Sequence, residues 1–149
     1  MIIFRKLLQK LFRRDEMPDE KFEINKEYLK EKYGIDKMKI DFLNTKKYDT
    51  QIGTKSFTER ETIKKLRSDI KKGFLYDDGP NGGDTHFLSD FSHKDDHLLS
   101  KKINSRDRLN YRVYRPYPIE DENGDPVLYQ KIVFESCARH ETNGRDEGY

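Results

Sequence analysis

The sequence contains no tryptophan and only one cysteine among its 149 residues. A single cysteine excludes an intramolecular disulfide framework, and the position of Cys137 inside an apolar run is typical of a small buried residue rather than a nucleophile. No apolar run of about 18 residues occurs, so the sequence predicts no membrane-spanning helix. The segment 1–14 also lacks the continuous apolar core and the small-residue cleavage site of a secretory signal. We therefore expect a cytoplasmic protein.

Hydrophobic residues are scarce as well, at 33% of the chain against 39% charged residues. A chain of this length has room for one modest core, and the lean composition indicates that part of it is solvated or ordered by a partner. The net charge of only +2 gives no global argument for nucleic-acid binding. Any such argument depends on the clusters of Lys and Arg in 1–14, 60–72 and 100–115.

The first 35 residues are expected to form a helical extension to the domain at 36–149. Residues 1–14 place apolar and basic side chains on different faces of a helix, which could dock on its own domain, lie on a membrane surface or pair with another protein. Residues 15–24 resemble a linker. A short helix over 25–34 is predicted from its Asn25 cap and its Gly34 stop.

The central part of the chain predicts one strand, one helix and a loop. Alternating apolar residues over 38–43 predict the strand. Thr58 and Glu61 have the spacing of a capping box, and an amphipathic helix of about four turns should follow as far as Gly73. Residues 77–97 have no clear periodicity and are expected to form a long loop.

The last third predicts a hairpin. In 108–114, Leu109, Tyr111 and Val113 alternate with polar and basic residues, so one sheet face should pack on a core while the other carries cations. A second apolar strand ends within 132–141, and the turn residues Asn and Gly lie between them in 120–126. A cationic sheet face suits an anionic ligand.

Cleavage of RNA without a metal requires a base for the 2′-hydroxyl, positive charge near the phosphorane and an acid for the 5′-oxygen. Arg108, on the polar face of the first strand, has the planar donor fork that suits a phosphate. His140, at the end of the second strand, titrates near neutrality. Lys101 and Lys102 lead into the first strand and could add positive charge.

Three segments carry a resemblance to a known family. Leu99-Ser-Lys-Lys-Ile103, Arg108-Leu-Asn-Tyr111 and Ser136-Cys-Ala-Arg-His140 resemble, in order and interval, segments of the YoeB branch of RelE-type toxins. The resemblance covers roughly residues 38–141. It implies an α+β domain, a small antiparallel sheet with two or more helices packed on it. It also implies a bacterial type II toxin that cleaves mRNA on the ribosome without a cofactor and is neutralised by a cognate antitoxin; a homodimer is left open.

The resemblance also assigns residues. The family's phosphate-binding arginine falls on Arg108 and its acid/base histidine on His140. Its glutamate base corresponds best to Asp84, with Asp90 as an alternative, and Glu141 stands where the family has a tyrosine. The basic residues expected to contact the substrate are Lys101, Lys102, Arg112 and Arg139.

Two other classes of function stay open. His86, His93 and His97 lie in an acid-rich stretch and could bind a divalent metal, which would make the protein a metal-dependent nuclease. Alternatively, the basic surfaces could bind RNA or a protein without cleaving anything.

Overall fold

The computed structural model describes residues 17–24 and 26–138, which form three α-helices, one 3-10 helix and six strands. The α+β class is therefore confirmed. The expected basic helix over 1–14 and the Asn25 cap lie outside the described residues. In chain order the elements are α2 (Lys26–Tyr33), β1 (Met38–Asn44), α3 (Lys46–Ile52), α4 (Phe57–Lys71), β2 (His86–Phe87), η1 (Ser89–Phe91), β3 (Asp96–Lys102), β4 (Arg108–Tyr114), β5 (Tyr117–Glu120) and β6 (Pro126–Ser136).

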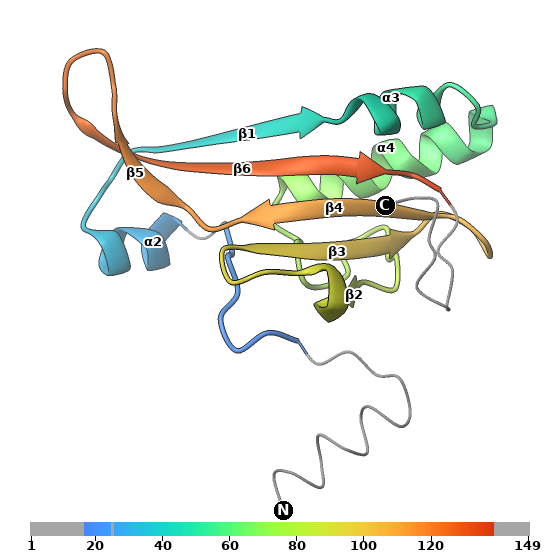
Figure 1. Ribbon diagram of the computed structural model, residues 1–149, viewed down its shortest axis with the longest axis horizontal. Helices are drawn as coiled ribbons and strands as arrows, with labels where there is room; N and C mark the ends of the chain where they lie inside the picture. The colour runs from blue at the N-terminus through green and yellow to red at the C-terminus, as the bar shows by residue number, and fades with distance from the viewer. Residues whose placement is uncertain (1–16, 25, 139–149) are drawn as a thin grey trace, which may run out of the picture.

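All six strands join one sheet with the order β1-β6-β4-β3-β2, and β5 pairs with the first part of β6 (Figure 1). Every pair is antiparallel except β1 and β6, which run parallel. The expectation of an antiparallel sheet is thus wrong for the edge strand β1. Two helices follow β1, and such a crossover lets a strand align in parallel with one much later in the chain.

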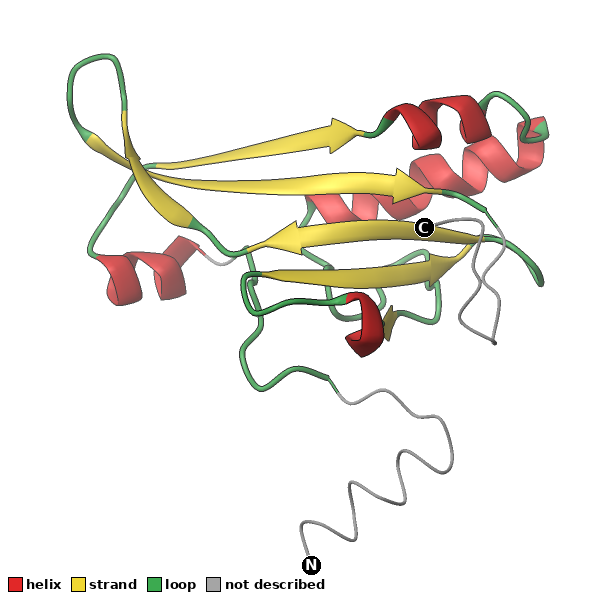
Figure 2. Cartoon of the chain, in the orientation of Figure 1, coloured by secondary structure: helices red, strands yellow, loops and turns green. Residues whose placement is uncertain are grey.

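The core lies between the sheet and α4, which crosses behind the sheet in Figure 2. Ile63, Leu66 and Ile70 project from α4 at helical spacing and are all buried, as the periodicity predicted. From β4 the alternate residues meet them, with the buried set Leu109, Tyr111 and Val113. Cys137 is also buried in this core, and burial raises its pKa to about 11. Its prediction as a buried residue is confirmed.

The start of α4 differs from the prediction by two residues. Ser56, not Thr58, is the N-cap: its Oγ accepts the Glu59 amide at 3.1 Å, and Glu59 Oε1 accepts the Ser56 amide at 3.0 Å. Both pairs of residues fit the Ser/Thr-x-x-Glu spacing, so the pattern locates a helix start only approximately.

The expected hairpin contains an additional strand. β4 pairs with β6 in antiparallel register, from Val113 opposite Ile132 to Asn110 opposite Ser136, as predicted. The turn near 121–125, however, joins β6 to β5 rather than to β4. The expected loop over 77–97 is also partly wrong, because it includes β2, η1 and the first residues of β3.

Residues 17–24 do not behave as a linker. The Phe22 side chain is 3% exposed and belongs to the core. Its amide donates to the Tyr76 hydroxyl at 3.0 Å, and its carbonyl accepts Gln130 Nε2 at 2.9 Å. The packed unit therefore begins before the boundary expected at residue 35.

Candidate functional site at the Arg108 loop

Arg108 is the first residue of β4, where the sheet meets the glycine-rich loop at 77–85. Its Nε donates to Ser100 Oγ at 2.7 Å, and its Nη2 donates to the carbonyls of Ser100, at 3.2 Å, and Asp84. Its backbone amide donates to the Ala138 carbonyl at 3.1 Å. The guanidinium is thus fixed by the neighbouring strand and by the loop, and two of the three predicted catalytic residues come together.

The loop is held in place from α4. Asp69, fully buried on α4, accepts both the backbone amide of Asn81 at 3.0 Å and its Nδ2 at 2.9 Å. Gly79 packs so closely here that a Cβ at that position would lie 2.6 Å from Asp69 Cγ. Asp84 itself has a positive φ of 45°, which non-glycine residues adopt rarely. Such a constrained backbone fixes the direction in which the Asp84 side chain leaves the loop.

The Asp84 carboxylate faces solvent and a histidine. Its Oδ1 lies 3.3 Å from His86 Nε2, and both side chains are more than half exposed. His86 is paired in register with Ser100, the residue that holds Arg108. An acid, an imidazole and a guanidinium therefore share one surface.

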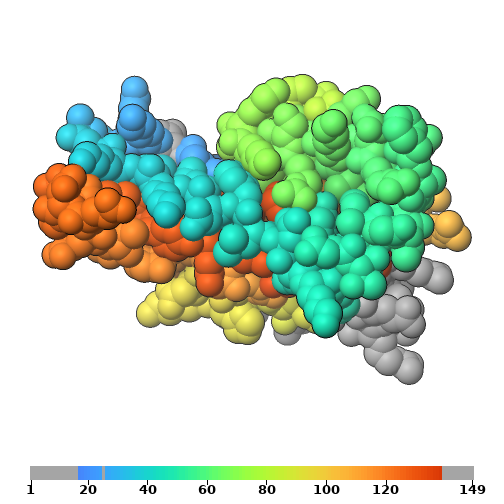
Figure 3. Space-filling view, turned by 90° about the horizontal axis from the view of Figure 1, so that it is seen from above, coloured from blue at the N-terminus to red at the C-terminus, as the bar shows by residue number. Residues whose placement is uncertain are grey.

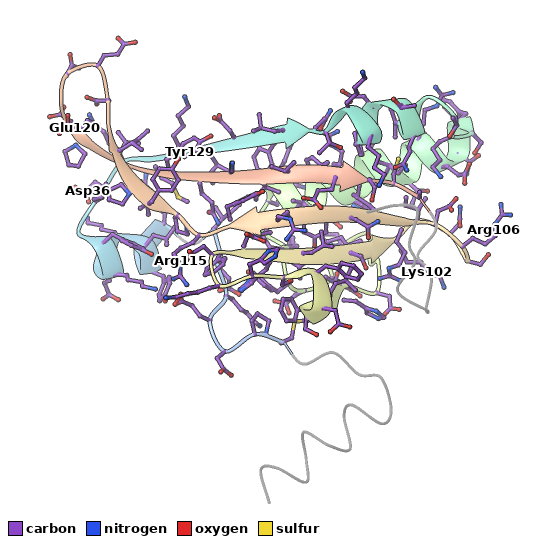
Figure 4. All side chains as sticks on the ribbon, viewed as in Figure 1. Asp36, Lys102, Arg106, Arg115, Glu120 and Tyr129 are labelled. Carbon is purple, nitrogen blue, oxygen red and sulfur yellow. The ribbon has the colours of Figure 1, made fainter. Side chains whose placement is uncertain are left out.

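Lys102 adds a second cation to this surface. It is exposed and stands opposite Arg108 in the register of β3 and β4, so both side chains emerge on the same sheet face. Figure 4 shows Lys102 and Arg106 at one end of the sheet, away from Arg115 and Tyr129. Lys102, which was expected to add positive charge for the substrate, therefore lies next to Arg108.

The turn that precedes Arg108 is fixed to the start of α4. Lys55 Nζ forms an ion pair with Asp107 at 3.1 Å, and both side chains are largely buried. Asn104 Nδ2 donates to Glu59 Oε2 at 2.7 Å. These two contacts limit how far the turn, and Arg108 next to it, can shift.

A row of polar residues lies beneath the site. Ser100, Asn110 and Ser136 are paired in register across β3, β4 and β6, and all three are fully buried. Asn110 Nδ2 donates to Ser136 Oγ at 2.8 Å. Sequence reasoning missed these residues as site components. They alternate with the apolar core residues and lie on the same sheet face as Arg108 and Lys102, so no signal in the sequence separated these buried polar residues from exposed ones.

Lys101 is placed differently from the expectation. Its side chain is fully buried on the core side of β3, and its Nζ donates to the Asp77 carbonyl and to Thr85 Oγ1, each at 2.8 Å. Burial lowers the pKa of Lys101, and the nearby carboxylates offset part of that decrease. A lysine in this position holds the loop and cannot contact a polynucleotide at the surface.

Arg112 lies on the expected face of β4 but is neutralised. Its Nε donates to Glu135 Oε2 at 2.7 Å, and its Nη1 donates to Asp96 Oδ1 at 2.5 Å. Burial would lower its pKa, but the two carboxylates raise it. Arg112 was expected to contact the substrate, but its guanidinium already pairs with two carboxylates, which reduces the positive charge it offers to a phosphate.

The three loop histidines do not converge on a metal site. His97 is buried, with Nδ1 at 2.6 Å from the Tyr76 hydroxyl and its ring stacked on Phe22 at 4.1 Å. His93 is exposed and pairs with Asp96 at 3.0 Å, and His86 pairs with Asp84. Within 17–24 and 26–138, no group of three or more His, Cys, Asp or Glu side chains could hold a metal ion. The alternative of a shared site at these three histidines is therefore wrong.

Burial of His97 makes stability depend on pH. Burial lowers the pKa of His97 below the usual 6.5, so the folded protein binds fewer protons than the unfolded chain just below that pH. The free energy of unfolding should therefore fall as the pH is lowered through 6.5 towards the folded-state pKa. Urea unfolding between pH 5 and 8 measures this, and His97→Phe should show a shallower dependence over the same interval. An identical slope in both proteins would show that another group is responsible.

The remaining predicted site residues, Arg139 and His140, lie outside the described residues, as does Glu141. No helix in the described part of the chain is long and apolar enough to cross a membrane. Comparisons with family models, with curated proteins and with solved structures find no match to this chain.

Proposed function

We propose that this chain is the toxin of a type II toxin–antitoxin system and cleaves mRNA on the ribosome as a metal-independent endoribonuclease. The observation that carries the proposal is the convergence of Arg108, Lys102 and Asp84 at one end of the sheet. A sheet with helices packed on it, in which a glycine-rich loop precedes the strands β3 and β4, also agrees with the α+β domain that the sequence resemblance implies.

In the proposed reaction, the RNA 2′-oxygen attacks the adjacent phosphorus and the bond to the 5′-oxygen breaks. Asp84 takes the 2′-hydroxyl proton, either directly or with His86 as its partner. Arg108 and Lys102 stabilise the negative charge that builds up on the phosphorane. The products are a 2′,3′-cyclic phosphate and a 5′-hydroxyl, so the step needs no water and no metal ion.

His140 is the proposed acid for the leaving 5′-oxygen. It follows Ala138 by two residues, and the Ala138 carbonyl accepts the Arg108 amide.

Expression of the chain alone in a bacterium should arrest growth and fragment mRNA, because no antitoxin would then cover the basic site. Protein that has been treated with EDTA and then freed of the chelator should still cleave when mixed with ribosomes, since the positive charge comes from Arg108 and Lys102 rather than from a divalent ion bound to the protein. Primer extension locates the cuts, and end analysis identifies the cyclic phosphates. Cleavage that EDTA abolishes and zinc or manganese restores would instead indicate a metal-dependent enzyme.

A non-catalytic module that binds RNA or protein is the second candidate. The placement of Lys101 and Arg112 favours it, because one is buried and the other is neutralised, leaving fewer cations for a substrate than the sequence suggested. Normal growth and intact mRNA after expression would support this second function.

A further inference from the structure

A groove of about 470 Å³ lies between α3 and α4. Its floor is apolar, formed by Tyr48 and Ile52 from α3 and Ile63 from α4. The two helices lie side by side on the face seen in Figure 3, where α3 is turquoise and α4 is green. No residue of the Arg108 site lines this groove, so it is a separate surface.

Cations form one wall of the groove. Arg60, Lys64, Arg67 and Lys71 recur along α4 at intervals of four, three and four residues, which places them in one stripe about 16 Å long. In the part of the chain that the structure describes, none of these four forms an ion pair. Other cations of this protein do bind carboxylates: Lys37, Arg112 and Arg115 each contact two.

Two of the wall residues contact aromatic rings. Arg67 Nη1 donates to the Tyr48 hydroxyl at 3.0 Å, and its guanidinium lies 4.1 Å from the centre of the Phe134 ring. Lys71 Nζ lies 5.7 Å from the centre of the Phe42 ring. Arg60, Lys64 and Lys71 are exposed. The groove therefore presents one cation that a hydrogen bond holds in place and three exposed cations that a ligand can order.

Phe57 lies at the N-terminal end of the same stripe, three residues before Arg60, and its side chain is 73% exposed. It is the most exposed of the large hydrophobic side chains described. An exposed aromatic ring beside an apolar groove is a frequent feature of surfaces that bind another protein.

We propose that this groove binds an acidic, amphipathic segment of a partner protein. Apolar side chains of the segment would contact the floor and Phe57, while its carboxylates would pair with the cations of α4. RNA fits the surface less well, because Tyr48 is 2% exposed and Phe57 alone leaves a single exposed ring on which a base could stack. The inference does not depend on cleavage of RNA at the Arg108 site.

Titration of the full chain against defined probes tests the proposal. The probe is a fluorescein-labelled helical peptide of about 18 residues with leucines along one face and glutamates beside them. Three comparison ligands are the same peptide with lysine in place of glutamate, a scrambled peptide of equal composition, and a short single-stranded RNA. Fluorescence anisotropy gives each dissociation constant.

Lys64→Glu and Lys65→Glu form a matched pair of variants, since the two residues are neighbours on α4, both are exposed and only Lys64 lines the groove. We expect the acidic peptide to bind, Lys64→Glu to weaken binding about tenfold or more, and Lys65→Glu to change it by less than about threefold. Phe57→Ser should weaken it severalfold. Thermal unfolding checks that each variant is folded.

Several results would overturn the proposal. The acidic peptide could show no measurable binding, or the scrambled peptide could bind equally well. The two lysine variants could weaken peptide binding equally. The RNA could bind more tightly than the peptide and lose its affinity in Lys64→Glu. The last result would assign the groove to nucleic acid. None of these outcomes bears on cleavage activity, so the two proposals fail independently.

Discussion

Replacement of Arg108 with alanine should lower the rate of RNA cleavage by about 10² to 10³, the usual effect of removing one charge-stabilising donor. Ser100 and the Asp84 carbonyl hold the guanidinium in place before the substrate arrives. A preorganised donor stabilises the phosphorane more than a mobile one, because little reorganisation is needed during the reaction. Single-turnover cleavage with ribosomes or model RNA measures the rate.

The side chain also has a structural role that must be separated from catalysis. Loss of its hydrogen bonds to Ser100 and Asp84 should cost about 0.5–1.5 kcal/mol each. Arg108→Lys keeps the charge but loses the planar fork, so it should restore part of the rate if charge dominates. Unfolding in urea gives the change in stability for both variants.

Arg106→Ala is the matched control. Arg106 carries the same charge and lies in the turn before Arg108, but its side chain is exposed and its amide bonds to Asn104 Oδ1. We expect the cleavage rate of this variant to stay within about threefold of the original, since an exposed charge surrounded by water interacts weakly with its neighbours. An active protein in which Arg108→Ala cleaves as fast as Arg106→Ala would remove Arg108 from the mechanism.

Local periodicity predicted the parts of the fold in which one face is apolar. The alternation around Tyr111 and the spacing of Ile63, Leu66 and Ile70 each follow from burial of a single face. Periodicity did not predict the strand β3, because its core face includes His97 and Lys101. These two side chains are polar, but hydrogen bonds satisfy them. The helix α3 was not predicted either, because seven residues make too few turns to establish a helical period.

The sequence could indicate a site residue only where its position within a single strand was informative. Arg108 could be chosen from its strand position, and its Nη2 donates to the backbone carbonyl of Asp84, which shows that the loop lies beside it. Neutralisation of Arg112 could not be foreseen, because Asp96 and Glu135 lie 16 and 23 residues away along the chain. Charge patterns in sequence report the number of cations on a strand, whereas sheet register decides which of them meet carboxylates.

Replacement of Phe22 with alanine should lower the free energy of unfolding by about 3–5 kcal/mol, the range for truncation of a buried phenylalanine. The ring stacks on His97 at 4.1 Å, and the Arg115 guanidinium lies 4.6 Å from its centre. Both contacts tie a segment near the N-terminus to residues more than 70 positions later, one in β3 and one just after β4. Chemical denaturation measures the change.

Met17→Ala provides the comparison, because Met17 lies in the same segment as Phe22 but its side chain is 41% exposed. It should change the free energy of unfolding by no more than about 0.5 kcal/mol, as surface substitutions usually do. A loss of less than about 1 kcal/mol in Phe22→Ala would mean that the segment is dispensable and that the domain begins near residue 36. The expected large loss would instead make residues around Phe22 part of the folding unit, since the backbone of Phe22 bonds to both Tyr76 and Gln130.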